Sequence, residues 1–299
     1  MTRLLALLVF TVAACSGCAR SPLLEQEIEN SYAEAAALDT LHDYEVARLA
    51  AAAQLARVEG LIARERKDPE LLALAVRGWC RYGFFFAWDD RELAEASSDS
   101  SAALYHGERA LAGFQRAGFY AGELLEFLAP GYPRDKPKKL RAYLQATFSE
   151  PEQAPYLMWA GCAELGKGFA ETDPGRRDDA REASRLLLEH ALALDPTTGD
   201  GNAELMLAAV TALAGDQRAA ADHLQRASRQ SHEKLLLVDV ARALLIDCTA
   251  KDERAFVERL GRVLAAGDLS PEHRLDNVVA KRHARRYLES PEWRSRCAR

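Results

Sequence analysis

β-Branched residues are scarce in this chain. Its 299 residues include only three Ile and twelve Val, whereas Ala and Leu are abundant. Ile and Val favour strands while Ala and Leu favour helices, so the composition argues against any extensive sheet. With 48% hydrophobic residues the chain is still able to bury a large core. The sequence therefore predicts an all-α globular protein.

An excess of positive charge is also missing. The formal net charge is −6 at pH 7 and the pI lies near 5.7. A chain with this balance has no general attraction to nucleic acid or to anionic lipid. We therefore expect no nucleic-acid partner.

The motifs of common hydrolases and metalloenzymes are absent. The sequence contains no H-E-x-x-H and no G-x-S-x-G, and its seven His are scattered. Residues 161–167 nearly complete a phosphate-binding loop, but Gly168 stands where Ser or Thr would hold magnesium. The acidic pairs Asp89-Asp90 and Asp178-Asp179 fall in turn-like surroundings, where we expect them to be solvated. We expect no enzyme activity, no metal site and no cofactor.

The uncharged apolar run that begins the chain is too short to cross a bilayer. It extends over residues 4–14 after Arg3, which suits a secretory signal. Val12-Ala13-Ala14-Cys15 fits a bacterial lipobox, in which the Cys thiol takes a diacylglycerol, and Cys18 is the alternative acceptor. We expect residues 1–14 to be a lipoprotein signal peptide and the mature chain to be lipid-anchored to a membrane in the periplasm. No Asp follows either Cys, which favours the outer membrane in a diderm host.

The remaining cysteines have no metal-ligand spacing. Cys80, Cys162 and Cys248 lie within apolar helical patterns, and Cys297 is near the end of the chain. A buried free Cys packs as a small hydrophobe. We expect packing thiols here and not a disulfide framework.

Helical hairpins are what the chain does contain. Residues 201–231 form the clearest one, with two amphipathic helices joined at Gly215-Asp216. The spacing matches the tetratricopeptide pattern, and residues 103–118 repeat its second-helix spacing. We expect residues 15–40 to be a lipidated tether with a short helix, and residues 41–299 to be tetratricopeptide-like hairpins (an α-solenoid) with additional packing helices. The predicted packing positions are Gly78, Ala110, Phe114, Ala117, Ala208, Gly215, Ala220, Leu224 and Ala227.

Two further stretches stand out. The predicted helix over residues 70–90 is the most aromatic part of the chain, so it is either covered on several sides or lines an apolar cavity. Three prolines between residues 130 and 137 predict an irregular connection. Five cations surround it, and we expect a solvated basic loop, with a docking patch for an acidic partner as the alternative. These cations are Arg134, Lys136, Lys138, Lys139 and Arg141.

The order of these features resembles the TRAP transporter T-component (TatT) family of periplasmic lipoproteins, which accompany tripartite ATP-independent transporters. Four stretches carry the resemblance. They are the lipobox; Glu59-Gly60-Leu61 followed by the segment 69–75 and the aromatic run 82–88; Trp159-x-Gly161; and Leu194-Asp195-Pro196 leading to the hairpin and to Leu275-x-Asn277.

The resemblance implies a homotrimer of tetratricopeptide-like hairpins that pairs with the periplasmic substrate-binding (P) subunit. It also implies an apolar cavity or pore for a hydrophobic or organic-acid ligand. The matching aromatic residues are Trp79, Tyr82, Phe85, Phe86, Tyr156 and Trp159. Thr197-Thr198 departs from the family, since an aromatic residue usually follows the Leu-Asp-Pro exit, and the connection over 172–182 is unusually charged.

A general tetratricopeptide scaffold for cell-envelope protein assembly is the alternative function. Such a lipoprotein would hold peptide segments in a concave groove. That groove would be rich in exposed Asn, Lys and Arg, whereas the whole sequence has only three Asn.

Overall fold

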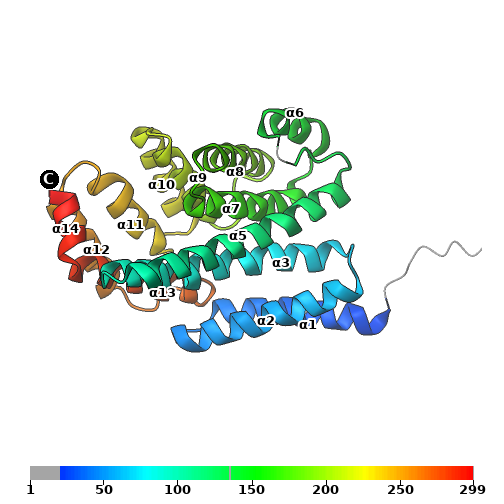
Figure 1. Ribbon diagram of the computed structural model, residues 1–299, viewed down its shortest axis with the longest axis horizontal. Helices are drawn as coiled ribbons and strands as arrows, with labels where there is room; N and C mark the ends of the chain where they lie inside the picture. The colour runs from blue at the N-terminus through cyan, green and yellow to red at the C-terminus, as the bar shows by residue number, and fades with distance from the viewer. Residues whose placement is uncertain (1–20, 135, 299) are drawn as a thin grey trace, which may run out of the picture.

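The computed structural model describes residues 21–134 and 136–298, and this part of the chain contains helices and no strands. The predicted all-α class is confirmed. The helices form an elongated body, with the start of α1 at one end and α12 and α14 at the other (Figure 1). No helix among the described residues is both long enough and apolar enough to pass through a bilayer. The candidate acyl acceptors Cys15 and Cys18 lie outside the described residues.

Three helices open the fold: α1 (Pro22–Asp39), α2 (Tyr44–Arg64) and α3 (Pro69–Tyr82). Each begins at a polar cap, because Ser21, Asp43 and Asp68 accept a hydrogen bond from the first backbone N–H groups of their helices. α1 packs through Leu24 and Ile28 onto the main core. The helical body therefore begins at Pro22, within the segment expected to be mostly tether.

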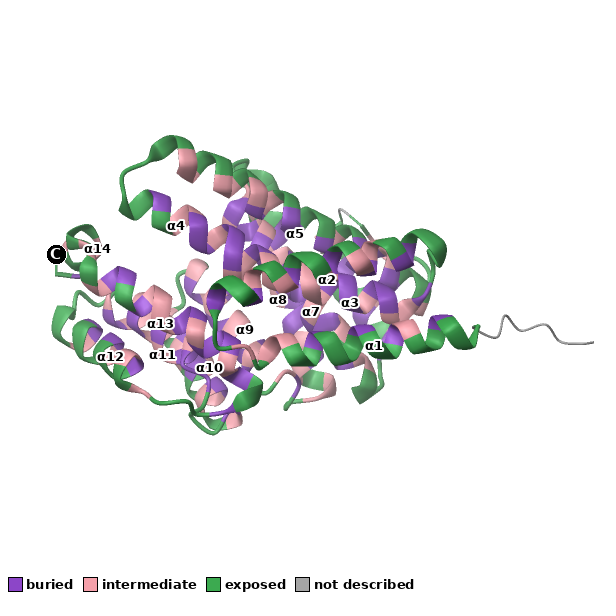
Figure 2. Cartoon of the chain, turned by 90° about the horizontal axis from the view of Figure 1, so that it is seen from below, coloured by how far each residue is buried: buried purple, intermediate pink, exposed green. Residues whose placement is uncertain are grey.

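The central helices surround the main core. They are the π-helical segment η1 (Gly83–Trp88), α4 (Asp89–Ala96), α5 (Ser100–Leu128), α6 (Pro137–Thr147), the short 3-10 helix η2 (Pro151–Gln153), α7 (Ala154–Ala170) and α8 (Pro174–Leu194). Buried residues line the inner sides of α3, α5 and α7, while the outer side of α1 is exposed (Figure 2). The expected break after Leu128 is present. Its last proline, however, starts a helix, because Pro137 is suited to a first helical turn.

The C-terminal third continues with shorter helices. These are α9 (Asn202–Leu213), α10 (Gln217–Gln230), α11 (Leu237–Arg242), the π-helical segment η3 (Ala243–Asp247), α12 (Glu253–Ala265), the 3-10 helix η4 (Pro271–His273), α13 (Arg274–Glu289) and α14 (Pro291–Ala298). Of these, α11, η3, α12, α13 and α14 pack around a second core cluster that includes Phe256, Leu260 and Tyr287.

The α9–α10 hairpin packs through small side chains. Ala208 of α9 is buried against Leu224 and Ala227 of α10. Gly215 makes the turn at φ +90°, a backbone conformation that favours glycine. Of the other predicted packing positions, Ala110, Phe114, Ala117 and Ala220 are buried, and Gly78 lies where a Cβ would come 2.9 Å from Leu55 Cδ2.

Phe114 is the point where three helices meet. Its ring is buried between Gly83 of η1 and Gly166 of α7, and a Cβ at either glycine would overlap it. Gly161 plays the same part for α8, because its added Cβ would lie 2.8 Å from Leu188 Cγ. Gly161 and Gly166, two glycines of the segment that nearly matches a phosphate-binding loop, are therefore points of close helix contact.

The expectation of free thiols is wrong. Cys80 of α3 forms a disulfide with Cys162 of α7, and Cys248 forms one with Cys297 of α14. The paired residues are 82 and 49 positions apart, so helix periodicity carried no sign that the fold brings them together. Each disulfide cross-links a long loop, which constrains the unfolded chain.

Replacing Gly166 by Ala tests the packing around Phe114. We expect Gly166→Ala to lower the free energy of unfolding by about 1–3 kcal/mol, because the new methyl group overlaps a ring that has no room to move. Gly60→Ala is the matched control, since Gly60 is exposed within α2 and has nothing within 4 Å of its added Cβ. That change should stabilise the protein by about 0.5–1 kcal/mol. Urea unfolding of both variants measures the difference, and equal effects would contradict the close contact.

Candidate ligand cavity and its polar wall

An apolar cavity of about 280 Å³ lies between the central and C-terminal helices. This volume is at the lower end of the range for small-molecule sites. Its apolar lining comes from η1, α7, α9, α11, η3 and α13. The lining residues include Phe84, Phe85, Trp88, Trp159, Leu165, Phe169, Leu205, Met206, Leu237, Val240, Leu244, Leu245 and Val279.

Both π-helical segments border this cavity. Phe84, Phe85 and Trp88 belong to η1, and Leu244 and Leu245 belong to η3. A π turn inserts an extra residue into a helix, which rotates the side chains after it and is frequent at functional sites. Both segments therefore contribute side chains to the lining of the same cavity.

The three consecutive phenylalanines of η1 point to different surroundings. Phe84 contacts Phe114 and Phe169. Phe85 faces the cavity, and Arg81 lies over its ring at 4.6 Å. Phe86 is buried against Tyr44 and Leu275 in a separate cluster. The aromatic run is thus covered on several sides and also lines a cavity, so both readings of it hold.

Two of the six aromatic residues predicted for the cavity, Phe85 and Trp159, line it. Tyr82 and Phe86 border a neighbouring void of only about 20 Å³, together with Phe85. Trp79 and Tyr156 border neither space; Trp79 Nε1 donates a hydrogen bond to Glu59 Oε1 at 2.8 Å, and Tyr156 packs against the main core.

Several lining residues were missed from the sequence. Phe84 and Trp88 belong to the aromatic run that was noticed, and only their direction was unknown. Phe169, Met206 and the C-terminal residues Leu237, Leu244 and Tyr287 had no distinguishing signal, because each occupies an ordinary apolar position of an amphipathic helix.

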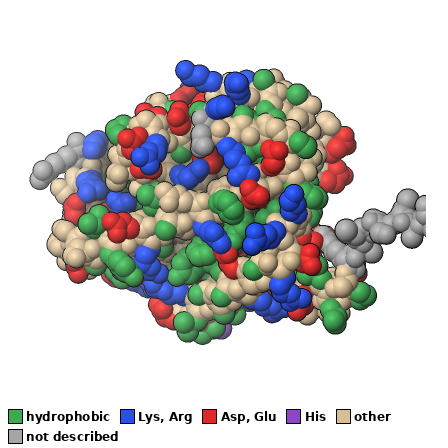
Figure 3. All heavy atoms as spheres, turned by 45° about the vertical axis from the view of Figure 1, so that its right-hand side comes forward, with side chains coloured by type: hydrophobic (Ala, Val, Ile, Leu, Met, Phe, Trp, Pro, Cys, Tyr) green, Lys and Arg blue, Asp and Glu red, His purple; other side chains and the backbone are tan. Residues whose placement is uncertain are grey.

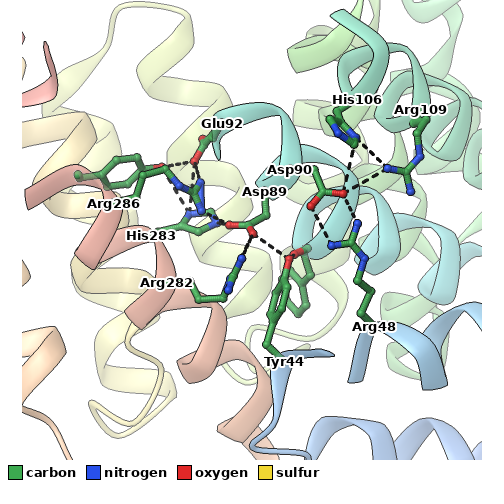
Figure 4. A network of polar contacts seen from close by, with 12 residues as sticks. Tyr44, Arg48, Asp89, Asp90, Glu92, His106, Arg109, Arg282, His283 and Arg286 are labelled. Carbon is green, nitrogen blue, oxygen red and sulfur yellow. Dashed lines mark hydrogen bonds and ion pairs between the residues drawn. The ribbon is translucent and has the colours of Figure 1, made fainter. Parts of the chain in front are cut away.

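Glu92, His283 and Tyr287 form a polar wall of the cavity. Tyr287 donates a hydrogen bond to Glu92 Oε2 at 2.8 Å, and Arg286 Nη1 donates to the same oxygen at 2.7 Å. His283 Nδ1 lies 4.0 Å from that oxygen as well. This wall continues into a buried network of charges behind it (Figure 4).

Asp89 is the centre of that network and is completely buried. It accepts hydrogen bonds from Tyr44 Oη at 2.8 Å, from Arg282 Nη2 at 3.0 Å and from Arg286. His283 Nε2 lies 3.3 Å from Asp89 Oδ1, and the Arg282 guanidinium stacks 3.7 Å from the centre of the Tyr44 ring. Figure 4 shows these side chains converging on Asp89 from α2 and α13.

Asp90 points the other way and has its own partners. Arg48 of α2 forms a two-pronged ion pair with it, Arg109 Nη1 of α5 lies 3.2 Å from Oδ2, and His106 Nδ1 lies 3.6 Å away. The expectation that Asp89-Asp90 is solvated in a turn is therefore wrong. The pair continues a helix and is surrounded by cations from elements distant in the chain. Asp178 and Asp179 are exposed, as expected.

The charges of the network are held fixed. Burial raises the pKa of the Asp89 carboxyl, but the contact with His283 and the charges of Arg286 and Arg282 outweigh burial and hold that pKa below its usual range. Burial, followed by the charge of Asp89, raises the pKa of Tyr44 above its usual value. Near neutral pH, Asp89 is thus anionic and Tyr44 neutral, which suits a structural ion pair.

Removing the charge of Asp89 tests its structural role. We expect Asp89→Asn to lower the free energy of unfolding at pH 7 by about 3–5 kcal/mol, because it removes the buried counter-charge of Arg282 and leaves Arg286 with Glu92 as its only carboxylate partner among the described residues. The pKa of Asp89 is depressed on folding, so its contribution is present above the unfolded value and declines below about pH 4. The difference between the variant and the wild type should therefore narrow between pH 5 and pH 3.

Asp178→Asn is the control for this change. Its carboxylate is exposed and lies 3.5 Å from Arg177, so the loss should stay within about 1 kcal/mol. Urea unfolding at several pH values measures both variants. If the Asp89→Asn variant were as stable as the control variant, the proposed contribution of the Asp89 network to the free energy of unfolding would be contradicted.

Within the described residues no group of three or more His, Cys, Asp or Glu side chains is arranged to hold a metal ion. The polar wall consists of ion pairs and hydrogen bonds between side chains of the protein.

The family model described as TRAP transporter T-component matches residues 40–292. This range includes η1, α4 and α13, so both the cavity and the Asp89 network fall inside the matched segment. The comparison with curated proteins finds no match.

Proposed function

We propose that this chain, which belongs to the TRAP transporter T-component family, is an exported lipoprotein. In this proposal it holds an apolar ligand for the transporter's substrate-binding (P) subunit. Family membership assigns an accessory role in a TRAP transporter, and the family is not an enzyme family. The binding of ligand and of P subunit, and the acylation of Cys15 or Cys18, are our proposals beyond that role.

The cavity is the observation that carries the ligand proposal. Aromatic and aliphatic side chains line most of it, and helices from both halves of the described chain enclose it. Burying the apolar surface of a ligand in such a space is favourable, by roughly 25 cal/mol for each Å² removed from water. A ligand held there would be shielded from the aqueous periplasm.

The charges beside the cavity favour a neutral ligand over an organic acid. Glu92 is paired with Arg286, and His283 lies beside Asp89. Arg81 also reaches the cavity, but its guanidinium lies 2.8 Å from Asp39. A carboxylate that entered would find its candidate cations already neutralised and would lose its hydration.

Besides Arg81, whose Nε and Nη2 atoms have no hydrogen-bond partner among the described residues, and His283, whose Nε2 atom has none there either, the cavity lining includes one neutral polar amide, Asn202. The Asn202 Nδ2 group donates to the Gly199 carbonyl at 3.0 Å, whereas among the described residues no donor contacts its Oδ1 atom. A hydroxyl or N–H group on an otherwise apolar ligand would find an acceptor there. We propose a neutral hydrophobic ligand, with at most one such donor.

The fold supports a tetratricopeptide-like arrangement. The α7–α8 and α9–α10 pairs each pack through small residues, at Gly161 and at Ala208. We propose that these pairs, together with α11, η3 and α12, are the hairpins of the family and that the protein assembles as a homotrimer. The scaffold alternative is less well supported, because the cavity between the central and C-terminal helices is lined mainly by apolar side chains.

Filling the cavity should abolish ligand binding. We expect Ala241→Phe, which places a ring in the cavity, to weaken binding of the neutral fluorophore N-phenyl-1-naphthylamine at least about ten-fold, which corresponds to about 1.4 kcal/mol. Ala63→Phe on the exposed side of α2 is the control and should leave the affinity unchanged. Fluorescence titration measures both.

Competition separates the two ligand classes. Decanol should displace the fluorophore at lower concentration than decanoate at pH 8, because only the alcohol enters without leaving an unpaired charge. Stronger displacement by decanoate would contradict the proposed neutral ligand. Unchanged affinity of the Ala241→Phe variant for the fluorophore would contradict binding in this cavity.

The partnership has its own test. The full-length lipoprotein, solubilised in detergent, should co-purify with the P subunit encoded beside it, and native mass spectrometry should show three copies of this chain. The Asp89→Asn variant should form less complex only in proportion to its smaller folded fraction, because Asp89 is buried and is not proposed to contact the P subunit. Absence of a complex at micromolar concentration of both proteins would contradict the P-subunit partnership, and a monomer would contradict the trimer.

A further inference from the structure

The N-terminal exit of the chain and helix α6 lie at the same end of the molecule. Leu24 of α1 shares the main core cluster with Leu71 of α3, Leu125 of α5 and Leu140 of α6. Figure 1 places the start of α1 at the lower right, the α2–α3 turn and the end of α5 above it, and α6 at the upper edge of this side. We call this the tether end, defined by residues 21–27, 64–68 and 126–141.

Unpaired positive charge gathers at the tether end. The sequence from residue 134 to residue 141 contains five cations and one Asp. Lys136, Lys138 and Lys139 are exposed, and among the described residues no ion pair or side-chain hydrogen bond engages them. Figure 3, which brings this end forward, shows Lys and Arg side chains at its upper edge. Arg66 and Lys67 add two exposed cations at the α2–α3 turn.

The stability of α6 does not explain these lysines. They flank the N-terminus of the helix, whose first turn contains no acidic residue and whose N-cap, Lys136, makes no side-chain capping hydrogen bond. Cations at a helix N-terminus are opposed by the helix dipole. A partner outside the chain is the simpler reason for placing positive charge there.

Some carboxylates at or near the tether end are engaged within the protein, whereas Glu25 and Glu65 are exposed and have no side-chain partner among the described residues. Glu27 pairs with Arg64 at 3.0 Å, and Glu123 pairs with Arg134 at 2.7 Å. Glu126 accepts hydrogen bonds from the backbone N–H groups of Gly131 and Tyr132. The negative net charge of the chain does not cancel the local excess, because salt screens charges beyond about 8 Å in physiological solution.

Two large apolar side chains are exposed at the same end. Leu23 is 78% exposed at the start of α1, and Phe127 is 50% exposed in the last turn of α5. Exposed apolar groups beside lysines are typical of surfaces that lie at a membrane interface, where the apolar group enters the headgroup region and the lysines stay at the surface.

We propose that the tether end lies on a bilayer and that Lys136, Lys138 and Lys139 bind the headgroups of anionic phospholipid. The proposal rests on the lipid anchor of the proposed function. Six residues from Cys15 to Ser21 reach at most about 20 Å, so an acylated Cys15 keeps this end close to the membrane. Anionic headgroups then meet the cations that the fold leaves unpaired.

Lysine footprinting tests this contact with the full-length lipoprotein. The protein is reconstituted into vesicles of phosphatidylcholine alone or with one quarter phosphatidylglycerol, and amine acetylation is followed by mass spectrometry. We expect Lys136, Lys138, Lys139 and Lys67 to react at least three-fold more slowly on the anionic vesicles. Lys251, beside α12 at the opposite end, should react equally on both, and 0.5 M salt should remove the difference.

Charge reversal separates the lysines from the anchor. In a single variant that carries Lys136→Glu, Lys138→Glu and Lys139→Glu together, the protection of Lys67 from acetylation on the anionic vesicles should fall by half or more. The control reverses Arg254, Arg262 and Arg294 to Glu, all exposed on α12 or α14 at the opposite end, and should keep that protection. Equal reactivity on the two vesicle types, or unchanged Lys67 protection in the lysine variant, overturns the headgroup contact.

The acylation of the protein is checked separately. Intact mass spectrometry of the same preparation reports whether Cys15 or Cys18 carries lipid. An unmodified chain contradicts the anchor on which the proposal depends, whereas an acylated chain without headgroup protection contradicts the lysine contact alone. Binding of the P subunit and of the fluorophore is measured in detergent and does not depend on either result.

Discussion

The ion pair between Asp89 and the arginines of α13 is the constraint on which the rest of the structure depends. Arg286 and Asp89 are 197 positions apart, yet the carboxylate is buried and bound by Arg282 and Arg286 on successive turns of one helix. Asp89 directly follows η1, so the same contact fixes the π-helical segment and α13 relative to each other. His283 and Tyr287, one position along from the two arginines, are thereby held at the cavity wall.

Local pattern was enough to predict the helices but not their long-range contacts. The hairpin around Gly215 and the close approach at Gly161 follow from spacing within a few turns, and both are present. The disulfides and the partners of Asp89 join residues dozens to nearly two hundred positions apart. A charged pair beside an aromatic run looks the same in one sequence whether it is solvated or buried.

The cavity was predicted only where its residues were chemically unusual. Aromatic side chains drew attention to residues 79–88, and of these Phe84, Phe85 and Trp88, all in the π-helical segment, line the cavity. Leu237 and Leu244 could not be distinguished in the sequence from residues of the packed core. An apolar residue has the same helical spacing whether its side chain packs against another side chain or lines a cavity. Which apolar stripe remains unfilled is a property of the assembled helices.

The proposed ligand cavity and the proposed membrane contact at the tether end differ in how their charged groups are paired. They also lie in different halves of the molecule. At the cavity the ionisable groups are paired within the protein, so neutral apolar matter is favoured there. At the tether end three lysines have no partner among the described residues. The helices that line the cavity lie toward the other half of the molecule, around α9, α11 and α13 (Figure 1). With the tether end on a bilayer, these cavity-lining helices would lie in the half of the molecule farther from the membrane.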